Sequence, residues 1–477
     1  MCICNQSKEA LPMAKVVIIG GGSLVFAGGL TRDILSYEAT QDATFTYVDI
    51  DPRRLELGVQ YAQRTINEGG YSGASVSGTL NRREALEGAD YIIVSILVGG
   101  FEAIKAEIDI PLKYGINQCI GDTLTPGGIM RCLRTLPELL DMGRDIQEIC
   151  PRAVVLNYTN PMSMLSWGFQ DAYPELQYVG LCHSVQGTAG EWTRRLGLEE
   201  GAVNYTCAGI NHQAWMLRFE ADRVDQLPRI RELAVDPKIW SGDTTRMEYV
   251  KHFGHPVTES SGHVSEYNWW FRKNDQTIGR YCDSEGAAWN GRPGFIKELY
   301  DRPDWEEHME KRVSDPEPLK LERGLEYGSR IINAIETGNG ELIHGNLKNH
   351  GLIDNLPAEA IVEVPIHVDK NGMQPIRIGA LPPHLAAINS AQIAVQELAV
   401  RAVQEKDPER VFQAMAMDPL CAMSCTLDEI RAMTRELMAA HRQYIPILDG
   451  KELADKKVMY THKQQDKEKH IDPGMEE

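Results

Sequence analysis

The chain has 477 residues, of which 43% are hydrophobic and 25% charged, a composition ordinary for a folded globular protein. Its 68 acidic residues outnumber the 49 Lys and Arg, and the formal net charge of −19 argues against binding to nucleic acid or to an anionic membrane. There is no apolar run of about 18 residues or more, so no transmembrane helix is predicted. The ten cysteines are scattered, with no CxxC pair, which indicates reduced thiols and a cytoplasmic protein.

Short apolar, β-branched runs alternate with helical patterns in the first part of the chain. The runs predicted to form strands are 15–19, 43–50, 91–97, 153–156 and 177–181. Strands that alternate with helices predict βαβ units and a parallel sheet. We therefore expect an α/β fold in which a Rossmann-like domain covers residues 14–205.

Beyond about residue 205 the alternation gives way to a different pattern. Two runs, 361–368 and 373–380, have the pattern of strands. Longer segments with the pattern of helices lie at 382–404, 409–417 and 427–441. This mixture predicts a second, α+β domain over residues 206–455, which we expect to serve substrate binding and oligomerisation. Residues 1–13 and 456–477 are expected to be flexible ends.

A glycine-rich turn follows the first predicted strand. Gly20-Gly21-Gly22-Ser23 matches part of the dinucleotide-binding fingerprint, with Val25 in the place of the third glycine. Such glycines let the backbone approach a pyrophosphate, which then lies at the N-terminus of the next helix. Asp49 ends the second strand, where a carboxylate binds the ribose of NAD, and Asp51 is the alternative. We predict that Gly20, Gly22, Ser23 and Asp49 bind NAD+; a turn without a ligand is the other interpretation.

Four polar segments follow, several of them at the ends of predicted strands, where an open α/β sheet places its ligands. They are 122–134, 157–161, 180–188 and 209–212. Cys182 and His212 are residue types that bind divalent transition metals, and two protein ligands would leave positions open for a substrate. Each residue taken alone is more often a core thiol or a structural histidine, and their spacing is not that of a zinc finger.

Together these motifs resemble glycoside hydrolase family 4, the NAD- and metal-dependent glycosidases, and most closely the α-galactosidases of that family. The resemblance extends from about Lys15 to Ile447. CHSV at 182–185 is similar to the α-galactosidase version of its motif. The matching segments are GGGS at 20–23, VDIDP at 48–52, DTLTPGGIMR at 122–131, NYTNPM at 157–162, GLCHSVQGT at 180–188, AGINH at 208–212, TESSGHVSEY at 258–267 and GLIDNLP at 351–357.

The resemblance implies a redox-assisted elimination, an exception to hydrolysis by two carboxylates. NAD+ takes a hydride from C3 of the sugar, a base removes the proton on C2, and the aglycone leaves C1 with help from an acid. Water then adds, and the hydride returns. A divalent cation, Mn2+ or another transition metal, polarises the oxygens near C2 and C3.

The resemblance also assigns the ligands. Cys182 and His212 match the metal ligands, and Asn160 matches a substrate-binding residue that Asn157 assists. Asn160-Pro161 is a candidate for a cis peptide bond.

The proton-transfer residues depart from the pattern of the phospho-glycosidases. The position directly after the metal-binding cysteine, which holds a general acid in some members, is His183. In the segment that carries the C2 base, alignment by eye puts His263 at the base position, with Tyr267 and Ser261 as alternatives. Asp122 matches an acidic residue that supports the base.

A neutral α-galactoside such as melibiose is the expected small-molecule substrate. α-Glucosides, α-glucuronides, α-galacturonides, phospho-glycosides and β-linked glycosides are alternatives for the same mechanism. Two other hypotheses are a plain NAD-dependent dehydrogenase, which would produce net NADH, and a catalytically silent NAD sensor. The resemblance further implies a homodimer or a homotetramer.

Overall fold

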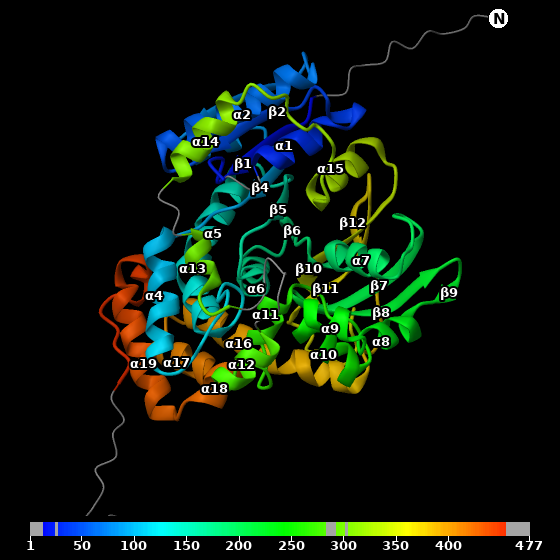
Figure 1. Ribbon diagram of the computed structural model, residues 1–477. Helices are drawn as coiled ribbons and strands as arrows, with labels where there is room; N and C mark the ends of the chain where they lie inside the picture. The colour runs from blue at the N-terminus through cyan, green and yellow to red at the C-terminus, as the bar shows by residue number, and fades with distance from the viewer. Residues whose placement is uncertain (1–12, 24–26, 283–291, 301–303, 455–477) are drawn as a thin grey trace, which may run out of the picture.

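The computed structural model describes residues 13–23, 27–282, 292–300 and 304–454 (Figure 1). The ends expected to be flexible, 1–13 and 456–477, lie outside the described residues except for Met13. In the described part of the chain, every helix is too short or too polar to cross a membrane.

The strands of the described residues all belong to one mixed sheet. They are β1 (Lys15–Ile19), β2 (Thr44–Val48), β3 (Ser75–Thr79), β4 (Tyr91–Val94), β5 (Val154–Asn157), β6 (Gln177–Gly180), β7 (Val203–Ile210), β8 (Gln213–Ala221), β9 (Val224–Asp225), β10 (Glu341–Lys348), β11 (Ile361–Asp369) and β12 (Gly372–Pro375).

Helices connect these strands and cover them. They are α1 (Ala27–Leu35), α2 (Pro52–Gly69), α3 (Arg82–Leu86), α4 (Gly100–Lys113), α5 (Thr125–Ile149), α6 (Met162–Ala172), α7 (Ser184–Arg195), α8 (Leu227–Leu233), α9 (Pro237–Gly242), α10 (Thr244–Phe253), α11 (Ser261–Glu266), α12 (Asp275–Tyr281), α13 (Phe295–Tyr300), α14 (Trp305–Ser314), α15 (Tyr327–Thr337), α16 (Pro383–Gln404), α17 (Pro408–Met417), α18 (Pro419–Ser424) and α19 (Leu427–Ala440), with short 3-10 turns at Glu38–Thr40, Arg442–Tyr444 and Pro446–Leu448.

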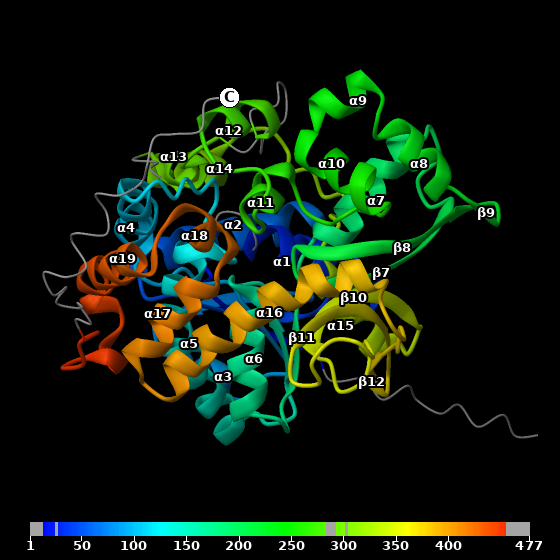
Figure 2. The ribbon, with the colours of Figure 1, turned by 90° about the horizontal axis from the view of Figure 1, so that it is seen from below.

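The strand order is β3-β2-β1-β4-β5-β6-β10-β11-β7-β8-β9, and β12 pairs with β11. The first six strands in this order are parallel, and the later pairs are antiparallel. β4 and β5 are buried at every position, because helices cover both faces of a parallel sheet. α1 packs on α2, whereas α5, α6 and α16 pack on one another, and the two groups lie on opposite faces (Figures 1 and 2).

The prediction of an α/β fold with a Rossmann-like sheet and a second α+β part is confirmed. The predicted strand at 373–380 is shorter in the structure, because β12 ends at Pro375, which has no N–H to continue the pairing. The division of the chain between residues 205 and 206 stays a proposal. That position lies inside β7, and the sheet continues across it.

Two strand pairs of the described sheet share only one pair of partner residues each: β6 with β10, where the parallel strands meet the antiparallel ones, and β11 with β7. Gly180 on β6 pairs with Asn346 on β10, and Glu363 on β11 pairs with Gly209 on β7. Asn346 and Glu363 are themselves opposite each other, so these four residues form one row across four strands. The Asn346 amide donates to the Gly180 carbonyl and to Glu363 Oε1, both at 3.2 Å. We call this set the four-residue row.

An unpaired histidine is buried close to this row. His344 on β10 is 2% exposed, its ring stacks on Tyr205 with 5.5 Å between centroids, and neither ring nitrogen has a hydrogen-bond partner. Burial lowers the pKa of His344 to about 3, so the ring stays neutral in the folded protein well below the pH at which a free histidine gains its proton.

We predict that His344→Phe makes the protein less sensitive to mild acid. Below about pH 6.5 this histidine binds a proton in the unfolded chain but not in the folded protein. Proton binding therefore favours unfolding, and the free energy of unfolding falls by about 2 kcal/mol between pH 7 and pH 5 because of this residue. Phe keeps the stacking and cannot titrate. The urea midpoint should therefore fall less between pH 7 and pH 5 in the variant than in the wild type. The exposed His350→Asn is the control, and equal losses in wild type and His344→Phe would contradict the prediction.

Candidate functional site

The glycine-rich turn joins β1 to α1 at the point where the strand order reverses. The N–H groups of Gly20 and Gly21 both donate to the Val48 carbonyl, at 2.8 and 2.9 Å, and the Ser23 N–H donates to the Gly20 carbonyl at 3.0 Å. Gly20 has a φ of +92°, and a Cβ there would lie 1.9 Å from the Ser95 carbonyl oxygen. Only glycine fits this position between β1 and β4, which is where doubly wound sheets bind nucleotides.

The two candidate acids for a ribose differ in what they contact. Asp49 is half-buried beside the turn and accepts the Gly22 N–H at 2.9 Å. Asp51 instead caps α2, since its side chain accepts the backbone N–H groups of Arg53 and Arg54. The structure therefore joins Asp49 to the glycine turn and gives Asp51 a structural role at the start of a helix.

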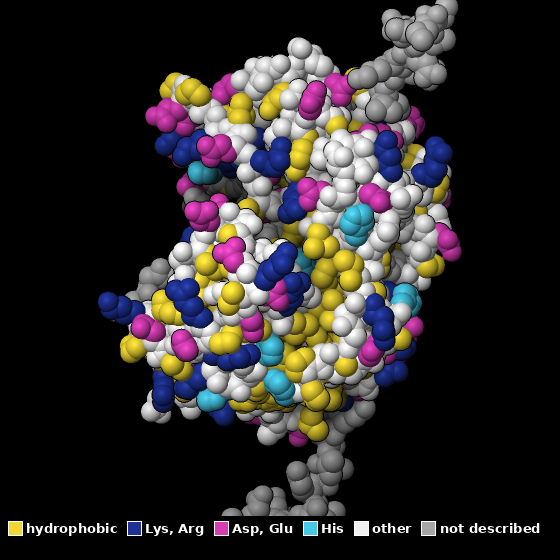
Figure 3. Space-filling model, turned by 90° about the vertical axis from the view of Figure 1, so that its right-hand side faces the viewer, with side chains coloured by type: hydrophobic (Ala, Val, Ile, Leu, Met, Phe, Trp, Pro, Cys, Tyr) yellow, Lys and Arg dark blue, Asp and Glu magenta, His cyan; other side chains and the backbone are white. Residues whose placement is uncertain are grey.

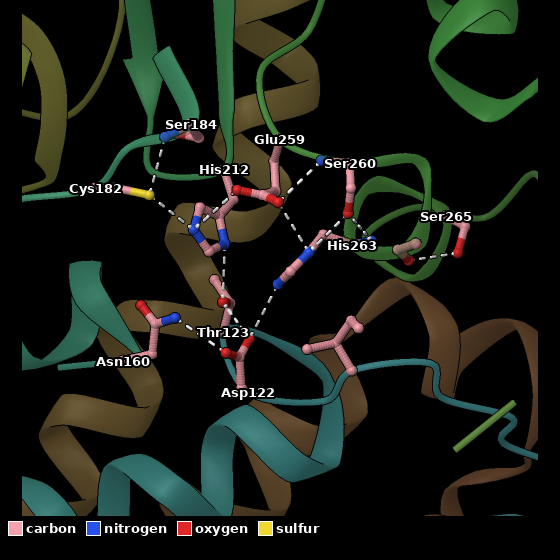
Figure 4. A network of polar contacts seen from close by, with 12 residues as sticks. Asp122, Thr123, Asn160, Cys182, Ser184, His212, Glu259, Ser260, His263 and Ser265 are labelled. Atoms are coloured by element: carbon pink, nitrogen blue, oxygen red, sulfur yellow. Dashed lines mark hydrogen bonds and ion pairs between the residues drawn. The ribbon is translucent and has the colours of Figure 1, made fainter. Parts of the chain in front are cut away.

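The two residues expected to bind a metal lie in contact. Cys182 follows β6 and His212 lies between β7 and β8, with 3.2 Å between Sγ and Nε2 (Figure 4). The other ring nitrogen, Nδ1, is 3.0 Å from Thr123 Oγ1 and 3.2 Å from the Tyr267 hydroxyl. These hydroxyls fix the orientation of the ring and leave Nε2 to face the sulfur, as outer contacts do for metal-binding histidines.

The backbone at His212 is in an unusual conformation. β7 ends at Ile210 and β8 begins at Gln213, so Asn211 and His212 form a two-residue turn. His212 has a φ of +63°, in the left-handed region that residues other than glycine rarely occupy. Such strain is concentrated at functional sites, and here the turn points the imidazole toward Cys182.

Burial raises the pKa of the Cys182 thiol to about 11. The thiol is therefore neutral at physiological pH in the free protein. Because a bound cation requires the thiolate, binding must release this proton.

Asp122 lies on the other side of His212, three residues before α5 begins at Thr125. Its carboxylate accepts the Asn160 amide at 3.0 Å and the Thr123 hydroxyl at 2.7 Å, and Oδ1 lies 3.6 Å from His263 Nε2. Burial opposes its ionisation, but His263 and Arg131 together hold the pKa of Asp122 well below its usual range. The Asn160–Pro161 peptide bond is cis, as the sequence suggested.

Asn157 does not join this network. Its amide donates to the Thr159 carbonyl and to Met162 Sδ, and its carbonyl accepts the Thr159 N–H, so its polar atoms are used within the turn that follows β5.

The sequence did not single out Glu259, yet this residue joins both halves of the site. Its Oε1 lies 3.1 Å from His263 Nδ1 and its Oε2 lies 3.5 Å from His212 Nε2. Its φ is +74°, so it shares the left-handed conformation of His212. The sequence did offer one signal for Glu259: it lies four residues before His263, within the polar segment 258–267 that resembles the family pattern.

The three candidates for the C2 base have different surroundings. The Tyr267 hydroxyl is bonded to His212, and the Ser261 hydroxyl donates to Asp243 Oδ1 at 2.6 Å. His263 is the candidate with a ring nitrogen directed at Asp122. Burial alone would lower the pKa of His263, but Glu259 and Asp122 on either side raise it well above its ordinary value.

His183 lies at the rim of the site, at the start of α7. Its side chain is 58% exposed, and Nδ1 lies 3.4 Å from Glu326 Oε1. The hydrogen bond that the His183 ring donates to Glu326 raises the pKa of His183, an effect that solvent weakens at so exposed a ring. The imidazolium that results is able to donate a proton near neutral pH.

Glu266 fixes the position of the Asp122 loop. This fully buried carboxyl group, at the end of α11, accepts the N–H groups of Cys119 at 2.7 Å, Ile120 at 3.1 Å and Gly121 at 2.8 Å. The helix that carries His263 is thereby bonded to the residues directly before Asp122.

We predict that Glu266→Gln destabilises the protein by about 1 to 3 kcal/mol, because one amide NH2 group would face backbone N–H donors that then lose their acceptor. The measurement is the shift of the urea midpoint at constant pH. Glu397→Gln, on the exposed face of α16, is the control and should change stability by less than about 0.5 kcal/mol. A Glu266→Gln midpoint equal to that of the control would contradict the role given to this carboxyl group.

The fold and the site define a nucleotide-binding α/β protein with a buried site suited to a cation. The family model for family 4 glycosyl hydrolases matches residues 15–198, and the model for their C-terminal domain matches residues 207–421. The chain belongs to this family.

Named relatives agree with this assignment. An α-galactosidase of Rhizobium meliloti is 36% identical over 91% of this chain and 89% of its own length. An α-galactosidase of Bacillus subtilis is also 36% identical, over 91% of this chain and 99% of its own length. A 6-phospho-α-glucosidase from gut microorganisms, solved in complex with NAD and Mn2+, has the same fold, with a TM-score of 0.74 and 17% identity over 93% of this chain and 100% of its own.

Proposed function

We propose that the protein is an NAD- and metal-dependent glycosidase that hydrolyses α-galactosides such as melibiose. The observation that carries the proposal is the contact of Cys182 with His212 beside the Asp122–Asn160 pair. The sulfur, imidazole, carboxylate and amide groups that the family chemistry uses thus lie in one buried network. The 36% identity to two α-galactosidases supports the choice of sugar.

The residues present fit both cofactors. The Gly20 turn lies at the switch point between β1 and β4, where doubly wound sheets bind a pyrophosphate, and Asp49 suits the ribose hydroxyls of NAD+ and would repel the additional phosphate of NADP+. Cys182 and His212 would hold Mn2+ or another divalent transition metal. When bound, NAD+ supplies a hydride acceptor and donor for C3 of the sugar, and the cation supplies a Lewis acid for the oxygens at C2 and C3.

The remaining chemistry belongs to the side chains. Asn160 orients the sugar through its amide, which Asp122 holds in place. His263 accepts the C2 proton at Nε2, the nitrogen next to Asp122, and must first be in its neutral form. His183 donates a proton to the leaving oxygen, and its exposure at the rim matches the side from which an aglycone departs into solvent.

We predict that reduced protein releases p-nitrophenol from its α-galactoside only when NAD+ and Mn2+ are both present. Cys182→Ser should lose at least about 100-fold in rate at limiting Mn2+, whereas Cys150→Ser, which changes a thiol at the end of α5, should retain the wild-type rate. Full turnover by Cys182→Ser would refute the metal site. Release of product without added NAD+, from protein freed of bound nucleotide, would refute the redox mechanism.

The same assay separates the alternatives. Matching glucosides, glucuronides, galacturonides, phospho-sugars and β-linked glycosides test the sugar and the anomer. Net formation of NADH would indicate a dehydrogenase, and binding of NAD+ without any turnover would indicate a sensor.

We predict that His263→Gln lowers kcat by about 10² to 10⁴-fold and leaves the affinity for NAD+ unchanged. The readout specific to a base is exchange at C2. In D2O the wild type should release galactose that carries deuterium at C2, and the variant should not exchange this hydrogen. Tyr267→Phe, which removes a hydroxyl bonded to His212, should keep the exchange at saturating metal. If Tyr267→Phe abolishes the exchange and His263→Gln does not, the base is Tyr267.

The cellular setting and the assembly are parts of the same proposal. All eight cysteines in the described part of the chain are free, which supports a reducing cytoplasm. A homodimer or homotetramer is supported by the family resemblance and by the apolar side chains that gather down the middle of one face, flanked by charged ones (Figure 3). With a net charge of −19, binding to nucleic acid or to an anionic membrane is not expected. The mass in solution measures the assembly directly.

A further inference from the structure

Three electron-pair donors meet at one point of the site. Cys182 Sγ lies 3.2 Å from His212 Nε2, and Glu259 Oε2 lies 3.5 Å from the same nitrogen. All three ligand atoms lie within 4.8 Å of one another. Two donors on one transition-metal ion, each at about 2.0 to 2.3 Å, are separated by about 3 to 4.5 Å, so this triangle has the size of a coordination sphere.

The triangle is unfavourable unless a cation or a proton lies between its donor atoms. His212 Nδ1 faces two hydroxyl groups, so its proton is best placed there, and Nε2 then directs a lone pair toward Glu259. A buried carboxylate beside a lone pair and a sulfur needs a cation or a proton between them. A thiolate and a carboxylate together balance the charge of a divalent ion, which removes the penalty of burying any one of these charges alone.

The backbone holds Glu259 in this position. It adopts a φ of +74°, opposite His212 at +63°, so both residues that approach the centre do so from strained backbone. The second carboxylate oxygen is fixed as well, since Oε1 accepts the Ser260 N–H at 3.0 Å and lies 3.1 Å from His263 Nδ1. Oε2 is the oxygen left to face Cys182 and His212 (Figure 4).

A second set of residues also has metal-binding distances. Asp122, His212 and His263 offer ligand atoms within 4.8 Å of one another. In this set, however, both oxygens of Asp122 already accept hydrogen bonds, from Thr123 and Asn160. His212 Nε2 faces Cys182 and Glu259, and its Nδ1 is bonded to hydroxyls. The geometry therefore favours the set that contains the sulfur.

We propose that Glu259 is a third protein ligand of the divalent cation, bound through Oε2 alongside Cys182 and His212. This inference rests on the metal dependence of the proposed function and adds a ligand to it. Three protein ligands leave positions open for two oxygens of a sugar, which is the arrangement of catalytic rather than structural metal sites. Because Oε1 receives the His263 Nδ1–H, the same carboxylate also directs His263 Nε2 toward Asp122.

The test uses Co2+ as a probe on reduced, nucleotide-free protein. Absorption from thiolate-to-cobalt charge transfer reports Cys182, and titration gives the dissociation constant without any turnover. Glu259→Gln should weaken Co2+ binding at least about 30-fold, keep the thiolate band at saturation, and change the ligand-field bands, since one oxygen donor is lost. Glu326→Gln removes a carboxylate that lies beside His183, outside the triangle, and should stay within about threefold of the wild type.

Two further variants make the result decisive. Glu259→Asp keeps a carboxylate on a shorter side chain and should bind Co2+ with an affinity between those of wild type and Glu259→Gln; it also replaces the Gln variant if circular dichroism shows that variant to be unfolded. Asp122→Asn should bind Co2+ within about threefold of the wild type. Binding by Glu259→Gln within threefold of wild type, or a larger loss in Asp122→Asn than in Glu259→Gln, would overturn the proposal.

The outcomes also separate this inference from the proposed function. If wild-type protein binds neither Co2+ nor Mn2+, metal dependence fails and the third ligand fails with it. If the wild type binds Co2+ with a thiolate band and hydrolyses the galactoside, and Glu259→Gln binds it equally well, the glycosidase assignment stands and the third ligand alone is wrong.

Discussion

The four-residue row constrains the site more than any other contact. Gly180 and Gly209 are its ends, and about three strand spacings, or about 14 Å, separate them. Cys182 comes two residues after the first glycine and His212 three residues after the second, so both metal-binding candidates start from fixed points and converge over a few residues. Asn346 and Glu363 fill the interval and are hydrogen-bonded to each other.

The ends of the row have little space for other residues. A Cβ at Gly180 would lie 2.5 Å from Met162 Sδ, and Gly209 has a φ of +156° with the Ala214 Cα 2.7 Å from an added Cβ. Glu363 is fully buried, and burial raises its pKa to about 7, so near neutral pH this carboxyl group is partly protonated behind His212. The interior of the site thus holds its negative charge on Asp122 and Glu259, and His263, which lies between these two carboxylates, balances it.

The sequence predicted the strands whose formation depends on a short local run of apolar residues. Apolar runs gave the strands next to Gly20, Asp49 and Cys182, because a buried parallel strand reads as a continuous apolar segment. The strand Ser75–Thr79 was not predicted, since this exposed edge strand has the sequence SVSGT. Glu341–Lys348 was not predicted either, since it carries His, Gly and Asn in its middle and becomes a strand through its neighbours.

The candidate site shows the same division. Cys182 and His212 could be recognised from residue type and family pattern. Glu259 could not, because its role depends on a left-handed backbone and on a contact with a histidine 47 positions away. Nor could the sequence separate His263 from Tyr267, since the direction of each ring is decided by Asp122, Thr123 and His212 in the folded protein.

The order of strands in the sheet differs from their order in the chain, and this bears on when the site can exist. β10 and β11 lie between β6 and β7 in space, yet they follow both in sequence. As the chain leaves the ribosome, the strands up to Gly180 can pair with one another, but Cys182 and His212 cannot reach their final separation until residues 341–369 have inserted between their strands. The nucleotide-binding half is therefore available early in synthesis, whereas the cation site is completed only when about three quarters of the protein has been made.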